Sequence, residues 1–200
     1  MKNSYAVFQL ILHDTENAAV VYSYLKNTVC PPFDYSDLLR WQWAQGVSAL
    51  DKFIHDIVRA GMLEIYMGKR EATPRWSSFP ISIELHQQMQ DNPAGACMLL
   101  ESEILRKHSF LSFQDPDKIA EALSFIWNEP HKWQVLSAKM GMDEKFVRTY
   151  LKNISIRRNQ IVHEGDYSSL HLQRQLISEQ DTKAVLDFIS KLAEAIFNST

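Results

Sequence analysis

The sequence is poor in the residues that mark disulfide-stabilised, metal-binding or membrane-spanning proteins. It contains two cysteines, Cys30 and Cys97, which are too few and too isolated for a disulfide framework, and no Cys and His spacing matches a zinc site. No segment approaches the ~20 uninterrupted apolar residues of a transmembrane helix. The short apolar run from Tyr5 to Leu12 ends at His13 without a small-residue cleavage site. These absences predict a protein of the reducing cytoplasm with no membrane partner, no metal and no cofactor.

An excess of charge of one sign is also lacking. The chain has 21 Lys and Arg residues against 24 Asp and Glu residues, which gives a formal net charge of -3. Such a chain has no global attraction to nucleic acid or to an acidic membrane, so a polyanionic partner requires a local cluster of basic residues. Hydrophobic residues make up 46% of the 200 residues, which is enough to bury a full core and argues against disorder.

Strand patterns longer than a few residues are absent, and helical periodicity takes their place. Between Asp37 and Met62, apolar residues recur at alternating spacings of four and three, which predicts one long helix with a continuous buried stripe. Further helices are expected at 4–28, 81–90, 97–113, 116–127, 130–140, 143–164 and 180–197. The sequence therefore predicts an all-α protein with one helical domain over residues 1–200 and a core at 37–197. Residues 1–30 belong either to the bundle or to an arm.

Residues 68–80 interrupt the helical pattern with a glycine and two prolines, which predicts a loop. This loop combines basic and aromatic side chains, namely Lys69, Arg70, Arg75 and Trp76. Such a combination can contact single-stranded RNA, although most loops of this kind are simply solvated surface. Both interpretations stay open at this point.

A first candidate for chemistry lies in the long helix expected from Asp37. Asp51 and His55 are four residues apart and therefore lie on the same helical face. The carboxylate can orient the imidazole for proton transfer. Alternatively, the two residues form an ordinary helix-surface pair, which is worth only a few tenths of a kcal/mol.

A second candidate is the segment Ser155 to Tyr167, SIRRNQIVHEGDY, at the end of another expected helix. Arg158 falls within the arc that must face the core, together with Val147, Tyr150, Leu151, Ile154 and Ile161. A guanidinium stays protonated and is costly to bury alone. Arg158 therefore needs a carboxylate, for which Asp51 is a candidate, or a run of carbonyls, or a cleft open to an anion.

The opposite side of this helix carries Ile156, Asn159 and His163. Apolar residues on both sides predict that the helix is covered twice, by its own domain and by a second copy of the chain. His163 lies in the last turn, where the negative helix end favours imidazolium, and Gly165 is placed to take a left-handed cap. His163 and Arg158 form either an acid/base site or a capping histidine and a buried ion pair. Five residues separate their directions by ~140°, so one ideal helix does not bring them together.

The segment Arg157 to Asp166, RRNQIVHEGD, resembles the signature of the HEPN superfamily. In that signature an Arg is followed by four to six residues and a His, with a polar residue directly after the Arg. Arg158, Asn159 and His163 match it in that order, while Arg157 keeps an alternative register. The segments SALDKFIHDIV at 48–58 and FQDPDKIAEAL at 113–123 resemble the RiboL-PSP-HEPN branch, so the likeness covers the chain from about residue 37 onward.

The resemblance implies an HEPN-type helical bundle with additional helices that dimerises through the motif helix. It implies a metal-independent endoribonuclease that cleaves single-stranded RNA through attack of the 2′-hydroxyl, in a defence or toxin–antitoxin system. The expected partners are RNA, a second copy of the chain, and an antitoxin or regulator protein. His163 is expected to move protons, Arg158 to stabilise phosphoryl charge and Asn159 to position either group. The supporting residues are Asp51, His55, Arg157 and Glu164.

The sequence departs from the family at two points. Where one HEPN branch has a Tyr two positions after the His, this chain has Gly165. Glu164 and Asp166 flank this glycine and would repel RNA if exposed. Because some HEPN proteins have lost catalysis, a non-catalytic RNA-binding or docking module is an alternative.

A rival interpretation comes from the segment before the motif. Residues Trp133 to Ile154, with a short turn at Gly141, have the spacing of a helix-turn-helix DNA-binding regulator. Asp143 and Glu144 begin the second helix, where phosphate and base contacts would be needed, and the chain is acidic overall. Two packed helices that lead into the motif are therefore the favoured interpretation.

Overall fold

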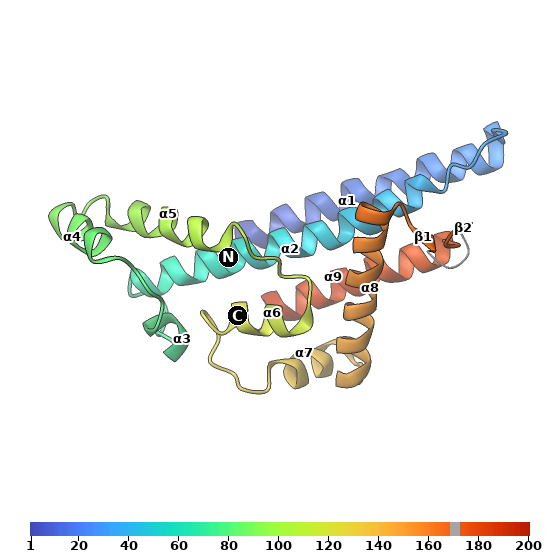
Figure 1. Ribbon diagram of the computed structural model, residues 1–200. Coiled ribbons are helices and arrows are strands. Elements are labelled where there is room, and N and C mark those ends of the chain that lie inside the picture. The colour runs from blue at the N-terminus through green and yellow to red at the C-terminus, as the bar shows by residue number, and fades with distance from the viewer. Residues whose placement is uncertain (169–172) are drawn as a thin grey trace.

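The computed structural model describes residues 1–168 and 173–200, and these residues are mostly helical (Figure 1). The helices are α1 (Lys2–Tyr24) with its π-helical continuation η1 (Leu25–Val29), α2 (Asp37–Tyr66), α3 (Pro74–Ser77), α4 (Ile83–Asp91), α5 (Ala96–His108), α6 (Pro116–Leu123), α7 (Lys132–Met140), α8 (Glu144–Glu164) and α9 (Glu179–Phe197). Two short antiparallel strands, β1 (Tyr167–Ser168) and β2 (Gln173–Arg174), follow α8. The predicted all-α class is confirmed. Among the described helices, none combines the length and the apolar character needed to cross a membrane.

Three long helices form the body of the protein. Helices α1, α2 and α9 lie side by side, and α8 crosses them (Figure 1). The stripe predicted for α2 is buried, from Trp43 to Ile57. Gly46 permits the close approach of α9, because a Cβ at this position would lie 2.6 Å from Cδ2 of Leu186. Helix α2 is therefore the central element against which the motif helix is positioned.

The N-terminal helix contributes to this core with its first half. Phe8 and Leu12 are buried against α2, whereas Val20 is 69% exposed and Val21 is 51% exposed. The first half of α1 thus belongs to the bundle, while the second half extends with the start of α2 beyond it (Figure 1). The chain leaves the helical conformation at Cys30, directly before the two prolines that predicted this end.

Some helix boundaries differ from the expected ones. The helix expected at 97–113 ends at His108, because the following residues form a loop whose Phe113 N–H donates to the Asp51 carboxylate. The helix expected at 116–127 ends at Leu123. The interruption expected at 68–80 contains the single-turn helix α3, which begins where the Thr73 hydroxyl caps the N–H of Trp76.

Candidate functional site

The motif helix α8 has the two faces that its sequence predicts. Asp143 caps its N-terminus by accepting the N–H of Phe146 at 2.9 Å, and Gly165 ends it with the predicted left-handed φ of 61°. The buried face comprises Val147, Leu151, Ile154 and Ser155. On the other side Asn159 and His163 are exposed, and Ile156 is 48% exposed. An apolar and polar surface of α8 is therefore open to a partner.

The first arginine of the motif is held inside the fold. The Nη2 atom of Arg157 lies 3.2 Å from Oδ2 of Asp166 and donates to the carbonyl of Leu176 at 2.8 Å. Its guanidinium also lies over the ring of Trp43, 5.2 Å from the centroid. Arg157 is thus neutralised and fixed, so the alternative register that would use it is not supported by its contacts.

Asp166 is the acceptor that organises this end of α8. Its side chain is fully buried and binds Arg40 Nε at 2.8 Å as well as Arg157. Its backbone has a φ of 64°, in the left-handed region that Asp tolerates better than most residues. The backbone carbonyl of Asp166 accepts from Gln175 N, which ties the segment after α8 to the segment before α9. Because Asp166 is buried and paired, it does not present the exposed negative charge considered from the sequence.

Arg158 has a different environment from Arg157. Its Nη1 donates to Oδ1 of Asn159 at 3.1 Å, and its Nε, like that of Arg157, has no hydrogen-bond partner among the described residues. No carboxylate of residues 1–168 or 173–200 lies within ion-pair distance of this guanidinium. Helix α8 crosses α2 rather than running along it (Figure 1), so its core-facing arc is covered only near the crossing and Arg158 is half-buried.

Asp51, the candidate carboxylate partner of Arg158, does not pair with it. The Asp51 carboxylate accepts the N–H of Phe113 and lies 3.5 Å from Nε2 of Gln114. It thereby fastens the loop before α6, and Ser155 of α8 donates to the Gln114 carbonyl at 2.6 Å. Asp51 thus supports α8 indirectly, through this loop.

His55 lies beside Asp51, as the four-residue spacing predicts. Its Nε2 is 3.9 Å from Oδ1 of Asp51, which is too long for a hydrogen bond, and its ring packs on Phe113 with centroids 4.4 Å apart. These contacts run to the loop before α6 rather than to His163. The pair therefore has the geometry of a packing and anchoring element.

His163 and Glu164 occupy the last turn of α8, and both are exposed. At ~100° per residue, Asn159 and His163 differ in direction by only ~40°, whereas Arg158 and His163 differ by ~140°. Helical geometry therefore places Asn159 and His163 on one face, and Asn159 also contacts Arg158, but the imidazole and the guanidinium point apart.

The basic and aromatic segment around α3 is largely engaged in internal contacts. Arg70 contacts Glu64 at 3.3 Å and the carbonyl of Ile126 at 3.1 Å. Arg75 pairs with Glu121, and its guanidinium lies over the ring of Phe125. Lys69 is exposed and has no ion-pair partner in the described ranges. Trp76 is half-buried and stacks parallel to Phe79.

This segment also lies far from the motif. Arg70 is anchored near Glu64 of α2, and Asp166 is anchored at Arg40 of the same helix. The intervening 24 residues of α2 correspond to about 36 Å of helix. Lys69, Arg70, Arg75 and Trp76 therefore do not share one site with His163 within a single chain.

The turn proposed for a helix-turn-helix is present. Helix α7 ends at Gly141, whose φ is 65°, and α8 follows after a short turn. However, the first turn of α8 carries Asp143 and Glu144, and Arg148 pairs with Glu144 and with Asp117 of α6. A recognition helix contacts base edges with its N-terminal residues, and here those residues are carboxylates.

Two features of the structure were not singled out from the sequence. Arg40 is buried and binds Asp166. Because the two residues are 126 positions apart, no local sequence pattern predicts this ion pair. His108 is 5% exposed, and its Nδ1 has no hydrogen-bond partner within the described chain. Burial, and to a smaller extent the charge of His55, lowers the pKa of His108 from its ordinary 6.5 to about 4. Local sequence does not predict this apolar histidine site, because the rings that pack on His108 come from Phe79, Phe113 and Phe125, in three separate segments.

Comparison of the chain with protein-family models, with curated proteins and with solved structures gives no match. The residues of α8 and their geometry are therefore the basis on which a function can be proposed.

Proposed function

We propose that this protein is a cytoplasmic, metal-independent endoribonuclease of the HEPN type that acts on single-stranded RNA as a homodimer. The observation that carries the proposal is the contrast between two adjacent arginines. Arg157 is neutralised by Asp166, whereas Arg158 has no carboxylate partner among the described residues and contacts Asn159. A guanidinium left without a counter-charge, five residues before an exposed histidine on the same helix, suits a phosphate ligand.

The proposed dimer resolves the poor convergence of Arg158 and His163 within one chain. Two antiparallel copies of α8 would place His163 of one chain near Arg158 of the other, so that each composite centre draws on both chains. Ile156 and Val162 are 48% and 49% exposed on α8 and would be covered in such a dimer. The site is therefore complete only when two copies associate.

In the proposed reaction the 2′-hydroxyl of RNA attacks the adjacent phosphorus. A new bond forms between O2′ and phosphorus, and the bond from phosphorus to O5′ breaks. One His163 accepts the proton of the 2′-hydroxyl, and His163 of the partner subunit gives a proton to the leaving O5′. The products are a 2′,3′-cyclic phosphate and a 5′-hydroxyl, which balances atoms and protons.

Each residue has a defined task in this scheme. Proton transfer by a positioned histidine accelerates such reactions by ~10²–10⁴-fold. Arg158 stabilises the charge that builds on the phosphoryl oxygens, and loss of one such preorganised donor costs ~2.7–4 kcal/mol of transition-state stabilisation. Asn159 fixes the guanidinium through its Oδ1, and its amide nitrogen remains able to donate to the phosphate.

The decisive experiment is cleavage of a labelled single-stranded RNA in excess EDTA by the wild type, His163→Ala and Arg158→Ala. The matched control is His86→Ala, which removes another exposed histidine from a helix far from the motif. Size-exclusion chromatography compares the oligomeric states of all four proteins. We expect the wild type and the control to release a 2′,3′-cyclic phosphate, and the two motif variants to lose at least 100-fold in rate, about 2.7 kcal/mol.

Other outcomes distinguish the alternatives. Retained RNA binding without cleavage, weakened by Arg158→Ala, would favour a non-catalytic HEPN module. Cleavage that survives His163→Ala would refute the proposed chemistry. Cleavage by a strictly monomeric protein would refute the composite site. An antitoxin or regulator protein is a further partner that the proposal includes, and it could inhibit cleavage by covering α8.

A further inference from the structure

The exposed side of α8 carries a row of polar and cationic residues that leads away from His163. At ~100° per residue, Lys145, Arg148, Lys152, Asn159 and His163 fall within an arc of about 60°. Lys145, Lys152, Asn159 and His163 are all exposed, and the Arg148 side chain is 43% exposed. We call Lys145, Arg148 and Lys152 the α8 ridge. A single helical face thus joins the proposed reaction centre to three cations.

The two lysines of the α8 ridge are not neutralised by the fold. Neither Lys145 nor Lys152 has a carboxylate within ion-pair distance in the part of the chain that the structure describes. By contrast, Lys26, Lys52 and Lys107 each contact a carboxylate. An exposed ammonium group without a partner is free to contact an external anion.

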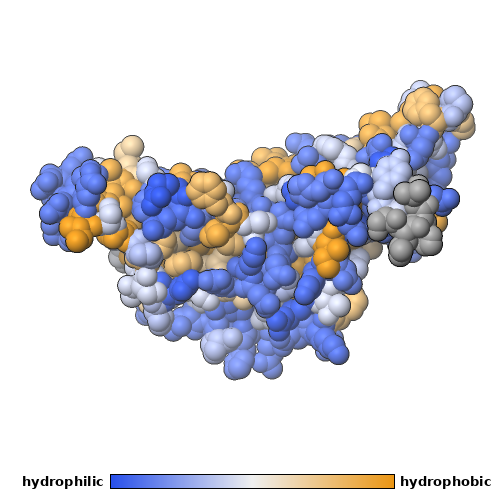
Figure 2. Space-filling model, in the orientation of Figure 1, coloured by the Kyte–Doolittle hydropathy of each residue, from blue (hydrophilic) through white to orange (hydrophobic). Residues whose placement is uncertain are grey.

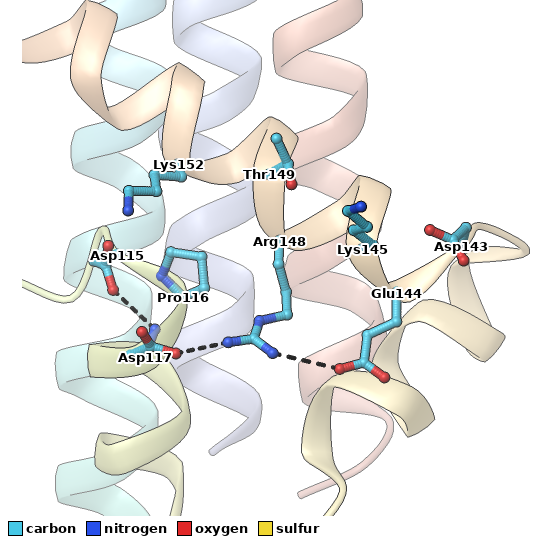
Figure 3. Close-up of a pocket in the computed structure, with 9 residues that line it drawn as sticks. All are labelled: Asp115, Pro116, Asp117, Asp143, Glu144, Lys145, Arg148, Thr149 and Lys152. Carbon is cyan, nitrogen blue, oxygen red and sulfur yellow. Dashed lines mark hydrogen bonds and ion pairs between the residues drawn. The ribbon is translucent and has the colours of Figure 1, made fainter.

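The three residues of the α8 ridge line a pocket of about 460 Å³ between the N-termini of α6 and α8 (Figure 3). Four carboxylates line this pocket, but each already has an internal partner. Asp115 accepts the N–H of Asp117, and Asp143 accepts the N–H of Phe146. The Arg148 guanidinium bridges Asp117 and Glu144, while Lys152 and Lys145 lie on either side of it (Figure 3).

We propose that the α8 ridge binds the phosphates of a single-stranded RNA that continues beyond the cleavage centre. This inference rests on the proposed function and adds a second subsite to it. Lys152 and Lys145 contact successive parts of the backbone. Arg148 partly neutralises Asp117 and Glu144, the two carboxylates that it bridges, and so weakens their repulsion of the strand. The strand is recognised through its charge rather than its bases.

The helix geometry sets how long the RNA must be. Lys152 lies 11 residues before His163 and Lys145 lies 18 residues before it, which correspond to about 16 Å and 27 Å along the axis. At the ~3.4 Å per nucleotide of a stacked strand, these distances span roughly five and eight nucleotides. A dinucleotide at the centre cannot reach the ridge, whereas a 12-nucleotide strand reaches both lysines.

The test measures binding separately from cleavage. The probe is a labelled 12-nucleotide RNA with 2′-O-methyl groups, which has no free 2′-hydroxyl for the reaction. It is titrated with the wild type, with the double variant Lys145→Gln/Lys152→Gln, and with the control Lys183→Gln/Lys191→Gln. The control removes two exposed lysines of α9 that also lack ion pairs among the described residues. Glutamine retains helix propensity, so the variants should fold.

We expect the ridge variant to bind the probe about tenfold more weakly. The slope of log K against log salt concentration should become shallower by ~1.4, because two phosphate contacts are lost. The α9 control should bind like the wild type. Asp117→Asn supplies a test of opposite sign, because it releases Arg148 and removes a repelling charge, and should tighten binding by roughly threefold. Cleavage of a dinucleotide should be unchanged in the ridge variant.

Two results would overturn the subsite. If the wild type and the ridge variant bind the probe equally, the ridge is not used, and the cleavage assay with His163→Ala still decides the proposed function on its own. If the wild type does not bind the probe at any salt concentration, the ridge has no RNA to hold. Dinucleotide cleavage would then show whether the reaction centre exists without it.

Discussion

Asp166 offers the most direct test of how the end of α8 is held. Its buried carboxylate accepts from Arg40 at 2.8 Å and from Arg157 at 3.2 Å. Asp166→Asn removes the charge but leaves a residue that tolerates the left-handed φ of 64°. The substitution therefore isolates the ion pairs from backbone strain.

The loss of stability expected for Asp166→Asn depends on the hydrogen bonds that Arg40 and Arg157 keep in the variant. Removal of one partner from a buried ion pair costs ~3–5 kcal/mol. Arg40 keeps the carbonyl of Gln175 and the hydroxyl of Ser36, and Arg157 keeps the carbonyl of Leu176. We therefore expect the lower end of the range, about 3 kcal/mol, which corresponds to a fall in Tm of about 6–12 °C. Asp166→Ala should cost about 1–2 kcal/mol more, because alanine strains at positive φ.

Urea unfolding at pH 7, followed by tryptophan fluorescence, measures these differences. Arg40→Gln and the double variant Arg40→Gln/Asp166→Asn complete a thermodynamic cycle with the wild type. We expect a coupling energy of at least about 1 kcal/mol, since the two side chains are in direct contact. A loss below about 0.5 kcal/mol for Asp166→Asn, or additivity of the two substitutions, would show that the network does not hold this end of α8.

Two further predictions concern groups outside α8. Because the pKa of His108 is about 4 when folded and 6.5 ordinarily, the unfolded chain takes up this proton first as the pH falls. Stability should therefore fall by about 3 kcal/mol between pH 6.5 and 4 on this account, and His108→Leu should flatten the pH dependence in urea titrations at pH 7.5 and 5. An unchanged pH dependence in that variant would contradict the assignment. Asp51→Asn should lower the free energy of unfolding by about 1–2 kcal/mol, because it weakens the acceptor of the Phe113 N–H, while Asp187→Asn at an exposed position of α9 serves as the surface comparison. Equal losses in both variants would refute the anchoring role of Asp51.

The sequence predicted the helices well where the determining signals were local. The left-handed cap at Gly165 and the prolines after Cys30 mark helix ends through the conformations of single residues. The loop after His108 was missed, because it depends on Asp51, a carboxylate 62 positions before Phe113. Apolar periodicity cannot report such a long-range hydrogen bond.

The same limit applies to the candidate site. The exposed polar face with Asn159 and His163 followed from helical spacing. The partners of the two arginines did not, because a helical wheel treats α8 as covered along its whole length, whereas a crossing helix is covered only at the crossing. Arg158 is therefore only half-buried, although it lies on the same face of α8 as Leu151 and Ile154, which are buried.

The position of α9 has a consequence for the newly made chain. Tyr5 of α1 stacks on Phe197 of α9 with ring centroids 4.5 Å apart, across 192 positions of sequence. At ~5–20 residues per second, a ribosome needs roughly 7–26 s to add the 131 residues that separate the end of α2 at Tyr66 from Phe197. During that interval α1 and α2 are without the helix that covers Gly46 and its neighbours. During this time the apolar residues of α1 and α2 that face α9 stay uncovered, and chaperones can bind such exposed apolar surface.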